Sequence, residues 1–459
     1  MSGESRAGTL RRAPLVADWW RFHQDRLGFL TACVRRYGET VRLRIVLPTF
    51  LINNPDDIHH VIVGRAANYA KSWQILGRGG RRMFGHGLAT RTREAHTRQR
   101  RLVQPAFHRH VLAAFVGAID AHVERMLHRW AHSAVVDLTI EMGRFVEDVL
   151  IDALLGELDP QIHRRLTEAG RARRQFIDHI FDAAVPLERM LPTPRHWAYW
   201  QAIRTQRQIL LTLLRRAGGG TTSETLLSRM AAAETPTAHR LSEADLLEEA
   251  LELLTAGFAT TREALTWACY LLAARPIEAL RVRDEVARVV GDGDVRADDV
   301  PRLVYTAMFF SEALRLFPPV WMFARAAIAD DELPSGVRVP AGSKIFLCQY
   351  TAHRNETSFP NPERFDPDRF DQASPARPRF SYFPFGGGVR VCVAEALARL
   401  QGVIVLASIS RRFDLDLRPG PPVEPIGAIT LRPKHPIRLG VQPSPAQDRI
   451  DAEGARSLA

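Results

Sequence analysis

Residues 379–402 read RFSYFPFGGGVRVCVAEALARLQG and contain Cys392, one of only four cysteines in the chain. An aromatic and glycine-rich run precedes this cysteine, and apolar residues at helical spacing follow it. A thiol between such a loop and a helix N-terminus can be held as a thiolate, because backbone N–H groups and the helix dipole lower its pKa. The glycines would let the main chain pass close to a large flat ligand, and Arg390 could bind a carboxylate on it. The alternative is an ordinary buried cysteine before a core helix.

The spacing within this loop favours the ligand. Residues 385–392 follow the pattern FGxGxRxC, which resembles the haem-ligand loop of the cytochromes P450. The resemblance implies that Cys392 is the axial thiolate of a haem iron. The family usually has glycine where this chain has Ala394, and we expect that change to shift packing against the porphyrin slightly. The residues that the resemblance places at the cofactor here are Phe385, Gly386, Arg390 and Ala394.

The composition is that of an ordinary globular protein. The chain has 459 residues, of which 46% are hydrophobic and 25% charged. It contains no run of about 18 apolar residues, which predicts no membrane span, and its N-terminus lacks the apolar core of a signal peptide. We therefore expect a cytoplasmic protein. The cysteines are far apart without a C-x-x-C, which argues against zinc, iron–sulfur clusters and disulfides.

The net charge of +11 raises nucleic-acid binding as a function of another class. Only three of the 62 basic residues are lysine, a bias that indicates a GC-rich genome rather than a phosphate-binding surface. The arginines are dispersed among acidic residues without a long basic tail. We therefore expect no nucleic-acid partner, and a basic patch for an acidic redox protein is the better interpretation.

Residues 242–275 form the longest expected helix. Ser242, with Asp245 three residues later, resembles a capping box. The middle of this segment, AGFATT at 256–261, contains glycine and threonine, which are poor helix formers. A threonine hydroxyl can donate to the carbonyl four residues earlier and open the helix locally. Beside a haem, that opening would make a polar notch for O2 and water.

This middle segment resembles the oxygen-binding motif of the P450s. The resemblance makes Thr260 the hydroxyl that positions the distal proton network. The family usually has Asp or Glu just before that threonine, where this chain has Ala259. Protons would then arrive through water or another side chain, or the chemistry would differ from hydroxylation, and these alternatives stay open. The candidate catalytic residues are Ala256, Gly257, Thr260 and Thr261.

Glu312 and Arg315 lie three apart on a helix expected over 302–315. Standing alone they would be a weak surface ion pair. With the following LFPP and a later FDPDRF they resemble the Glu-x-x-Arg pair of the P450 core, with Arg369 as its third member. The resemblance implies a buried network that positions the cysteine loop. Removal of one partner would then cost roughly 3–5 kcal/mol.

Further cofactor and substrate contacts rest on the same resemblance. His96 and Arg100 share one face of a basic helix, which could also be a solvated surface. Their order is similar to that of the P450 helix whose two polar residues hold the haem propionates, and Arg325 corresponds to another propionate ligand. The expected substrate-pocket residues are Trp73, Ile75, Leu76, Met83 and Phe84 from the loop 71–90, and Val320, Trp321, Phe323 and Ile429.

The resemblance extends over roughly residues 38–440. It implies a mainly α fold with small β-sheets, a triangular prism of helices with the haem between the long central helix and the helix after the cysteine loop. We expect one domain over residues 1–442. Residues 443–459, rich in Ser, Asp, Glu and Gly, are expected to be a disordered tail.

The implied activity is that of a haem-thiolate monooxygenase. It would insert one oxygen atom of O2 into a hydrophobic terpenoid, polyketide or fatty-acyl molecule, in bacterial secondary metabolism. The implied cofactor is haem b. Electrons would come from NAD(P)H through a separate ferredoxin and ferredoxin reductase, because the chain has no flavin or iron–sulfur segment, and we expect a monomer.

Two alternatives to this activity stay open. One is a P450-fold enzyme of non-hydroxylating chemistry, such as ring formation, rearrangement or peroxide-driven oxidation, which Ala259 suggests. The other is a haem protein that binds a ligand without turnover.

Overall fold

The computed structural model describes residues 15–45, 47–71, 85–182, 193–217, 225–235, 239–291 and 293–444. The α-helices are α1 (Leu15–Gln24), α2 (Arg26–Tyr37), α3 (Pro55–His59), α6 (Arg93–Val103), α7 (Arg109–Leu112), α8 (Val116–Ala131), α9 (Leu138–Leu155), α10 (Pro160–Asp182), α11 (Pro194–Ala217), α12 (Leu226–Ala232), α13 (Glu243–Ala274), α14 (Pro276–Val289), α15 (Val304–Leu316), α16 (Gln349–Ala352) and α17 (Glu395–Arg412). None of the described helices combines the length and the apolar character that spanning a bilayer requires.

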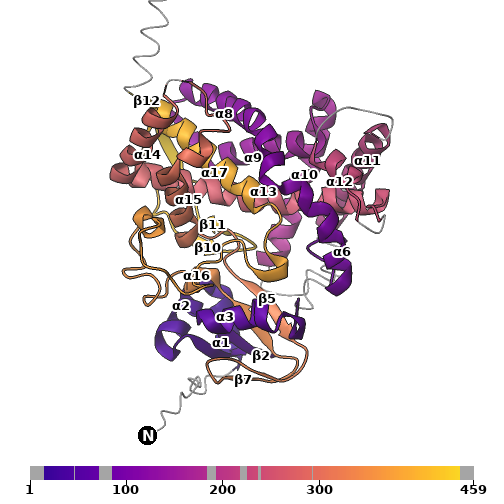
Figure 1. Ribbon diagram of the computed structural model, residues 1–459, viewed down its shortest axis with the longest axis vertical. Coiled ribbons are helices and arrows are strands. Elements are labelled where there is room, and N and C mark those ends of the chain that lie inside the picture. Colours follow the sequence, from indigo (N-terminus) through magenta and orange to yellow (C-terminus); the bar gives the residue numbers. More distant parts are fainter. Residues whose placement is uncertain are drawn as a thin grey trace, which may run out of the picture.

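Strands make up a small part of the molecule. They are β1 (Thr40–Ile45), β2 (Leu47–Ile52), β3 (Tyr69–Lys71), β4 (Val135–Asp137), β5 (Phe323–Ala327), β6 (Asp331–Glu332), β7 (Arg338–Val339), β8 (Lys344–Leu347), β9 (Phe413–Leu417), β10 (Pro425–Gly427), β11 (Leu431–Pro433) and β12 (Arg438–Pro443). The largest sheet has the order β1-β2-β8-β5-β3, in which only β2 and β8 run parallel. It lies with α1, α2 and α3 at one end of the molecule, and the long helices form the other part (Figure 1).

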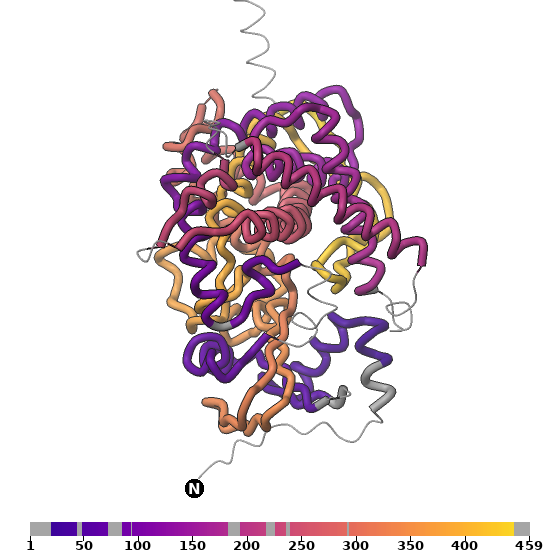
Figure 2. The backbone as a smooth tube through the Cα atoms, turned by 90° about the vertical axis from the view of Figure 1, so that its right-hand side faces the viewer, coloured from indigo at the N-terminus to yellow at the C-terminus, as the bar shows by residue number. Residues whose placement is uncertain are grey.

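Helix α13 is the centre of the helical part. It packs against α9, α11, α15 and α17, and Figure 2 shows it surrounded by other helices. The predicted capping box is confirmed, because the Ser242 hydroxyl accepts from the Asp245 N–H at 3.1 Å and the Asp245 carboxylate accepts from the Ser242 N–H at 3.2 Å. The main hydrophobic core lies between α8, α9, α13, α15 and α17. The central element of the fold is therefore this buried helix, whose N-terminal capping box was predicted from the sequence.

Ordered structure continues just past residue 442, the predicted end of the domain. Strand β12 continues to Pro443, and the N–H of the buried Ser444 donates to the Arg412 carbonyl at 2.8 Å. Ordered contacts therefore extend to residue 444. The rest of the expected tail lies outside the described residues.

Candidate active site

The loop before α17 is a tight turn closed by its own backbone. The Cys392 N–H donates to the Phe385 carbonyl at 3.0 Å. Gly386 and Gly388 have φ angles of +73° and +61°, in the left-handed region that favours glycine. A Cβ on Gly388 would also lie 2.6 Å from the Ile62 carbonyl oxygen. These two glycines are thus explained by turn geometry and by the protein's own packing, in addition to the predicted approach of a ligand.

Cys392 and Ala394 lie just before the first turn of α17. Ala394 has a φ of −97°, so alanine fits there without backbone strain. Cys392 is exposed, whereas the other three cysteines are buried. Crowding by protein atoms nevertheless raises the pKa of the Cys392 thiol, although the Ala394 N–H and the Arg100 charge lower it. The predicted lowering of this pKa by a backbone N–H is therefore present, but burial outweighs it, and a metal ion bound to the sulfur would add the positive charge that favours the thiolate.

Helix α13 brings Ala256 and Thr260 onto one face, because residues four apart differ by only about 40° in direction. The Thr260 hydroxyl donates to the Ala256 carbonyl at 2.7 Å, as predicted. The helix is continuous from Glu243 to Ala274, however, so the predicted local opening is absent. Gly257 is directed instead towards Leu150 of α9, 3.5 Å from the position of a Cβ. Ala256 is exposed in the middle of this otherwise well-covered helix.

Basic side chains gather where α6, β3, β5 and the cysteine loop meet. They are Lys71, His96, Arg100, Arg325 and Arg390. Burial, followed by the charges of Arg390, Lys71 and Arg100, lowers the pKa of His96 to about 4. Burial, with the charges of Arg390 and Arg325, lowers the pKa of Lys71 to about 7 against the opposing charge of Glu252. Burial and the Arg390 charge lower the pKa of Arg325 to about 10. The cationic cluster (these five residues) is therefore poorly compensated by the protein's own acids.

Arg390 shows most directly that the cationic cluster lacks hydrogen-bond acceptors for its buried N–H groups. Its Nη2 donates to the Arg91 carbonyl at 2.8 Å, but its buried Nη1 has no hydrogen-bond partner among the described residues. Nearby, Arg100 Nη1 donates to the Val391 carbonyl at 2.6 Å, directly beside the cysteine. A buried guanidinium N–H without a partner costs about 1–3 kcal/mol or more. The cluster is suited to an anion that would pair with it.

The predicted ion-pair network is present and buried. Glu312 and Arg315 are both 0% exposed, and Arg315 donates to the two Glu312 carboxylate oxygens at 2.7 and 2.8 Å. Arg369 Nε lies 3.5 Å from Glu312 Oε1. The carboxylate also accepts from the Asp366 N–H at 2.9 Å. This arrangement satisfies a buried charge pair that would be costly if incomplete.

His353 connects this network to the start of the cysteine loop. Arg315 Nη1 donates to the His353 carbonyl at 2.9 Å, and the His353 ring accepts from the Phe383 N–H at 3.0 Å. Burial and the Arg315 charge lower the pKa of His353 to about 3, which keeps the ring neutral so that its nitrogen can accept. The network thus holds the backbone of Phe383 through His353, a link that was not visible in the sequence.

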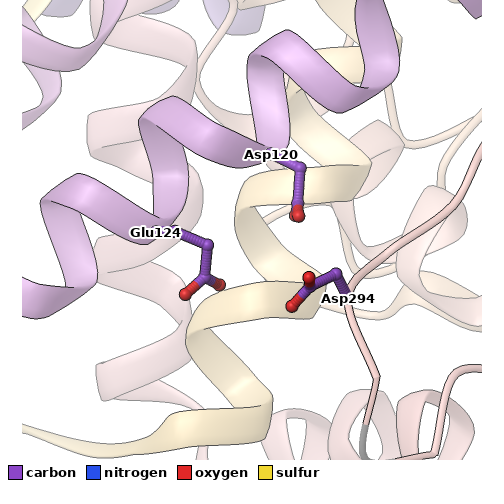
Figure 3. Close-up of side chains that lie close together, drawn as sticks. All are labelled: Asp120, Glu124 and Asp294. Carbon is purple, nitrogen blue, oxygen red and sulfur yellow. The ribbon is translucent and has the colours of Figure 1, made fainter.

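A separate acidic cluster lies on α8 and beside the end of α17 (Figure 3). Asp120, Glu124 and Asp294 offer oxygen atoms within 4.8 Å of one another. Arg411 Nη2 lies 3.8 Å from both Glu124 and Asp294, and Arg412 pairs with Glu124. Two guanidinium groups already oppose three carboxylates, so we interpret this cluster as an ion-pair network between helices rather than a metal site.

Comparison with known protein families tests the resemblance to the cytochromes P450. A family model described as Cytochrome P450 matches residues 9–441. The chain belongs to the cytochrome P450 family. The predicted fold, mainly helical with small sheets, is confirmed, and the enzyme class is that of a P450 monooxygenase.

Two streptomycete P450s are similar over nearly their whole length. Cyclooctatin synthase of Streptomyces melanosporofaciens is 31% identical, with 94% of each chain covered. Pentalenene oxygenase of Streptomyces avermitilis is 29% identical over 94% of this chain and 96% of its own. The solved structure of retinoic acid bound cyanobacterial CYP120A1 superposes with a TM-score of 0.83 at 24% identity, covering 93% of this chain and 96% of that one. This last similarity concerns the fold.

Membership of the P450 family implies a haem, and the residues of this chain fit one. Cys392 is exposed at the end of the glycine turn, and the unpaired Arg390 Nη1 marks a place for a carboxylate. His96, Arg100 and Arg325, which the resemblance assigns to the haem propionates, lie in the same cationic cluster. Lys71 also belongs to this cluster but was not predicted as a site residue. Its rarity was the available signal, because the chain has only three lysines among 62 basic residues.

The predicted substrate-pocket residues lie in different environments, and not all of them can line a pocket. Trp321 is 4% exposed within a core that includes Leu30 and Val41, and its indole N–H donates to the Ala428 carbonyl at 2.9 Å. It is therefore a core residue, contrary to the prediction. Phe323 contacts the Phe383 ring edge-on, with centroids 6.3 Å apart. Trp73, Ile75, Leu76, Met83 and Phe84 lie outside the described residues.

Two other predicted residues are only partly buried, as a pocket wall would be. Ile429 packs against an apolar cluster from α10 and α11, and Val320 is half-buried at the end of the segment after α15. Thr261, by contrast, points about 100° away from Thr260 around α13. It belongs to a different face from Ala256.

Replacing Arg390 by methionine is expected to have opposite effects on the apoprotein and on haem binding. In the apoprotein, the substitution removes one cation from a cluster of buried, mutually repelling cations. The free energy of unfolding of the apoprotein should therefore stay the same or rise by up to about 1 kcal/mol. Haem release to a scavenging apoprotein should become about tenfold faster, because a charged hydrogen bond is lost. Arg379→Met, at an exposed position of the same loop, is the control. Equal haem retention in Arg390→Met and the parent protein would contradict this role.

Proposed function

We propose that this P450 is a haem-thiolate monooxygenase that hydroxylates a terpenoid, in which the Cys392 thiolate would hold the haem iron. The observation that carries the proposal is the exposed Cys392 beside a buried cationic cluster with an unpaired Arg390 N–H. Cysteine thiolate ligation donates electron density to iron and favours O–O cleavage, which is the chemistry that the bound haem supplies. Electrons from NAD(P)H would arrive through a separate ferredoxin and ferredoxin reductase.

The residues around the cofactor have distinct roles. Arg390, with His96, Arg100 and Arg325, would hold the propionate carboxylates, and Lys71 adds positive charge at the same place. His96 would do so by donating one hydrogen bond from its ring, whose pKa is lowered to about 4 by burial and by the neighbouring cations. Phe385 and Gly386 shape the turn that presents Cys392. The buried pair of Glu312 and Arg315 keeps that turn in place through His353.

On the distal side, Ala256 and Thr260 provide room and a hydroxyl. Ala256 is small and exposed, which leaves space beside the helix. The Thr260 hydroxyl donates to the Ala256 carbonyl, so its lone pairs face outward and can accept a hydrogen bond from water. Thr260 would thereby orient a water chain that carries protons inward.

The proposed substrate class rests on the relatives and on an apolar wall. Relatives named for cyclooctatin and pentalenene, at about 30% identity, oxidise terpenoids. In this chain the partly buried Ile429 packs on a buried apolar cluster that contains Phe176, Ile177 and Tyr199, so an apolar side chain is held there on a firm support. An apolar side chain at that place suits a compact hydrocarbon skeleton, which gains affinity mainly from burial.

The test uses two named probes and a contrasting one. Purified protein with a surrogate ferredoxin, its reductase and NADPH should convert pentalenene or cyclooctat-9-en-7-ol into a product one oxygen atom heavier. With labelled O2, that atom should carry the label. Palmitic acid is the contrasting substrate, and turnover of palmitic acid alone would replace the terpenoid class by a fatty-acyl one. Spectral binding of the probes without any product would favour the non-catalytic alternative.

Ala259 supports a second candidate, an enzyme driven by peroxide. In that case hydrogen peroxide would support product formation and NADPH with the redox proteins would not. Products lacking an atom from O2 or peroxide would instead indicate ring formation or rearrangement.

A further inference from the structure

We propose that Glu263 replaces the acid missing at position 259 and relays protons to the water chain at Thr260. This inference rests on the proposed monooxygenase function. It identifies the residue that delivers protons to the water chain at Thr260. The carboxyl group would have moved one helical turn along the same face of α13.

The position of Glu263 on α13 suits this role. It lies four residues after Ala259 and three after Thr260, spacings at which helical side chains are neighbours. Helical Cα–Cβ bonds tilt towards the N-terminus, so the Glu263 side chain leans over the turn that contains these two residues. Because residue 259 has only a methyl group, the space beside that turn is not filled by another acid.

The carboxyl group of Glu263 is buried and half satisfied. The side chain is 0% exposed, and its Oε1 accepts from Arg262 Nε at 3.0 Å. Its Oε2 is buried and has no hydrogen-bond partner within the part of the chain that the structure describes. Buried carboxyl oxygens normally have a partner, and a water molecule or a proton would satisfy this one. The mechanism above uses no other buried acid at this point of the helix.

The charges around Glu263 come from three elements. Arg262 on α13 and Arg432 on β11 lower its pKa, and Asp178 on α10 raises it, but burial is the largest effect and raises it overall. A carboxyl group with a raised pKa can carry a proton and give it up near neutral pH. Arg262 is 21% exposed, so the pair extends from the buried Oε2 to the surface and offers a path for reprotonation.

The three other buried acids on the same helix, Glu248, Glu249 and Glu252, fit the role less well, because each precedes Thr260 by two turns or more. Glu252 precedes Thr260 by two turns, and its side chain leans away from it. Its Oε1 accepts from the Ala89 N–H at 2.6 Å. Glu249, a further turn away, accepts from Gln99. Glu252 thus holds the segment before α6 against α13, and Glu249 holds α6 itself. Within the described residues, the Glu263 carboxylate accepts its hydrogen bonds from the neighbouring Arg262.

The stoichiometry defines what Glu263 must supply. Conversion of R–H and O2 to R–OH and H2O consumes two electrons, from NAD(P)H through the redox proteins, and two protons. Each proton would leave Glu263 Oε2, pass through water oriented by Thr260, and be replaced from bulk water past Arg262. With hydrogen peroxide as the oxidant, R–H and H2O2 give R–OH and H2O, and no further protons or electrons are required.

This difference provides the experiment. Full-length Glu263→Gln, loaded with haem, is compared with the parent protein using the better of the two terpenoid probes. NADPH-driven product formation should fall at least about tenfold, with a larger solvent deuterium isotope effect, because loss of a general acid typically costs 10²–10⁴-fold. Peroxide-driven product formation should be unchanged. Glu249→Gln, which also removes a buried carboxyl from α13, is the matched control and should leave both rates unchanged.

A rescue and a spectroscopic measurement complete the test. Ala259→Glu combined with Glu263→Gln should restore NADPH-driven turnover by returning the acid to its usual position. The infrared spectrum of the full-length protein should contain a carboxylic acid band that persists above about pH 5, beyond the ordinary range of glutamate, and is absent from Glu263→Gln.

The possible outcomes separate this inference from the proposed function. Absence of turnover in the parent protein by either route would contradict the monooxygenase itself. If the parent protein is active, an unchanged NADPH-driven rate in Glu263→Gln would overturn the relay. Equal loss of both rates would overturn it as well, since that pattern indicates a structural residue. A Glu263 carboxyl already ionised at about pH 5 would also contradict it.

Discussion

Cys392→Ser is expected to abolish NADPH-driven oxidation, lowering the rate by roughly a thousandfold or more, which corresponds to about 4 kcal/mol in the activation barrier. Serine is close in size but is a poor ligand that does not donate electron density as a thiolate does. The reduced, CO-bound parent protein should show the red-shifted Soret band that is characteristic of thiolate ligation. The variant should lose that band even where it retains haem through the cationic cluster.

Cys33→Ala is the matched control for this experiment. Cys33 on α2 is buried in a core with Leu30 and Val41, a cluster that contains no residue of the glycine turn. Its replacement should leave the Soret band in place and lower stability only slightly. A red-shifted band in Cys392→Ser, or its absence from the parent protein, would show that another group holds the iron.

Arg315→Ala is expected to lower the free energy of unfolding by about 3–5 kcal/mol, because it leaves the Glu312 carboxylate buried without its main partner. Arg315 is 0% exposed and donates to two backbone carbonyls as well as to Glu312. The loss should be measurable by urea unfolding of the apoprotein. Because His353 loses its partner too, haem should also be released faster from the loosened cysteine loop.

Arg281→Ala provides the control with similar geometry at the surface. Arg281 donates to both Asp368 oxygens at 2.7 Å, but the two side chains are 47% and 52% exposed. Its loss should cost no more than about 1 kcal/mol. Replacing Glu312 and Arg315 together by methionine should cost less than Arg315→Ala alone, since no buried charge is then left unpaired. Equal costs at the buried and exposed pairs would contradict the predicted role of burial.

The predictions that succeeded concern short-range interactions or a specific spacing. The capping box at Ser242, the Thr260 back-bond and the three-residue pairing of Glu312 with Arg315 each involve residues within one helical turn. Such contacts depend mainly on local geometry, which a sequence specifies directly. The family resemblance then extended these local features to the correct fold.

The predictions that failed concern the environment of a side chain. Trp321 was expected in a pocket because it is large and apolar, but the same properties suit the core in which it packs. The pKa of Cys392 was expected to be lowered by backbone N–H groups at the helix start, and the Ala394 N–H does lower it, but burial of the thiol outweighs this and raises the pKa overall. Both outcomes depend on residues far away in sequence, which no local pattern contains.

The sequence by itself determined the family, the position of the cysteine and the helix that carries Thr260, because these follow from local spacing and from motifs in family order. Only the tertiary structure decided that Lys71 joins four other basic residues, that Arg390 has a buried N–H without a partner, and that Glu263 is buried one turn beyond Ala259. The physical reason is that charge compensation and desolvation are set by every group around a side chain. That surrounding becomes known only when distant segments are packed together.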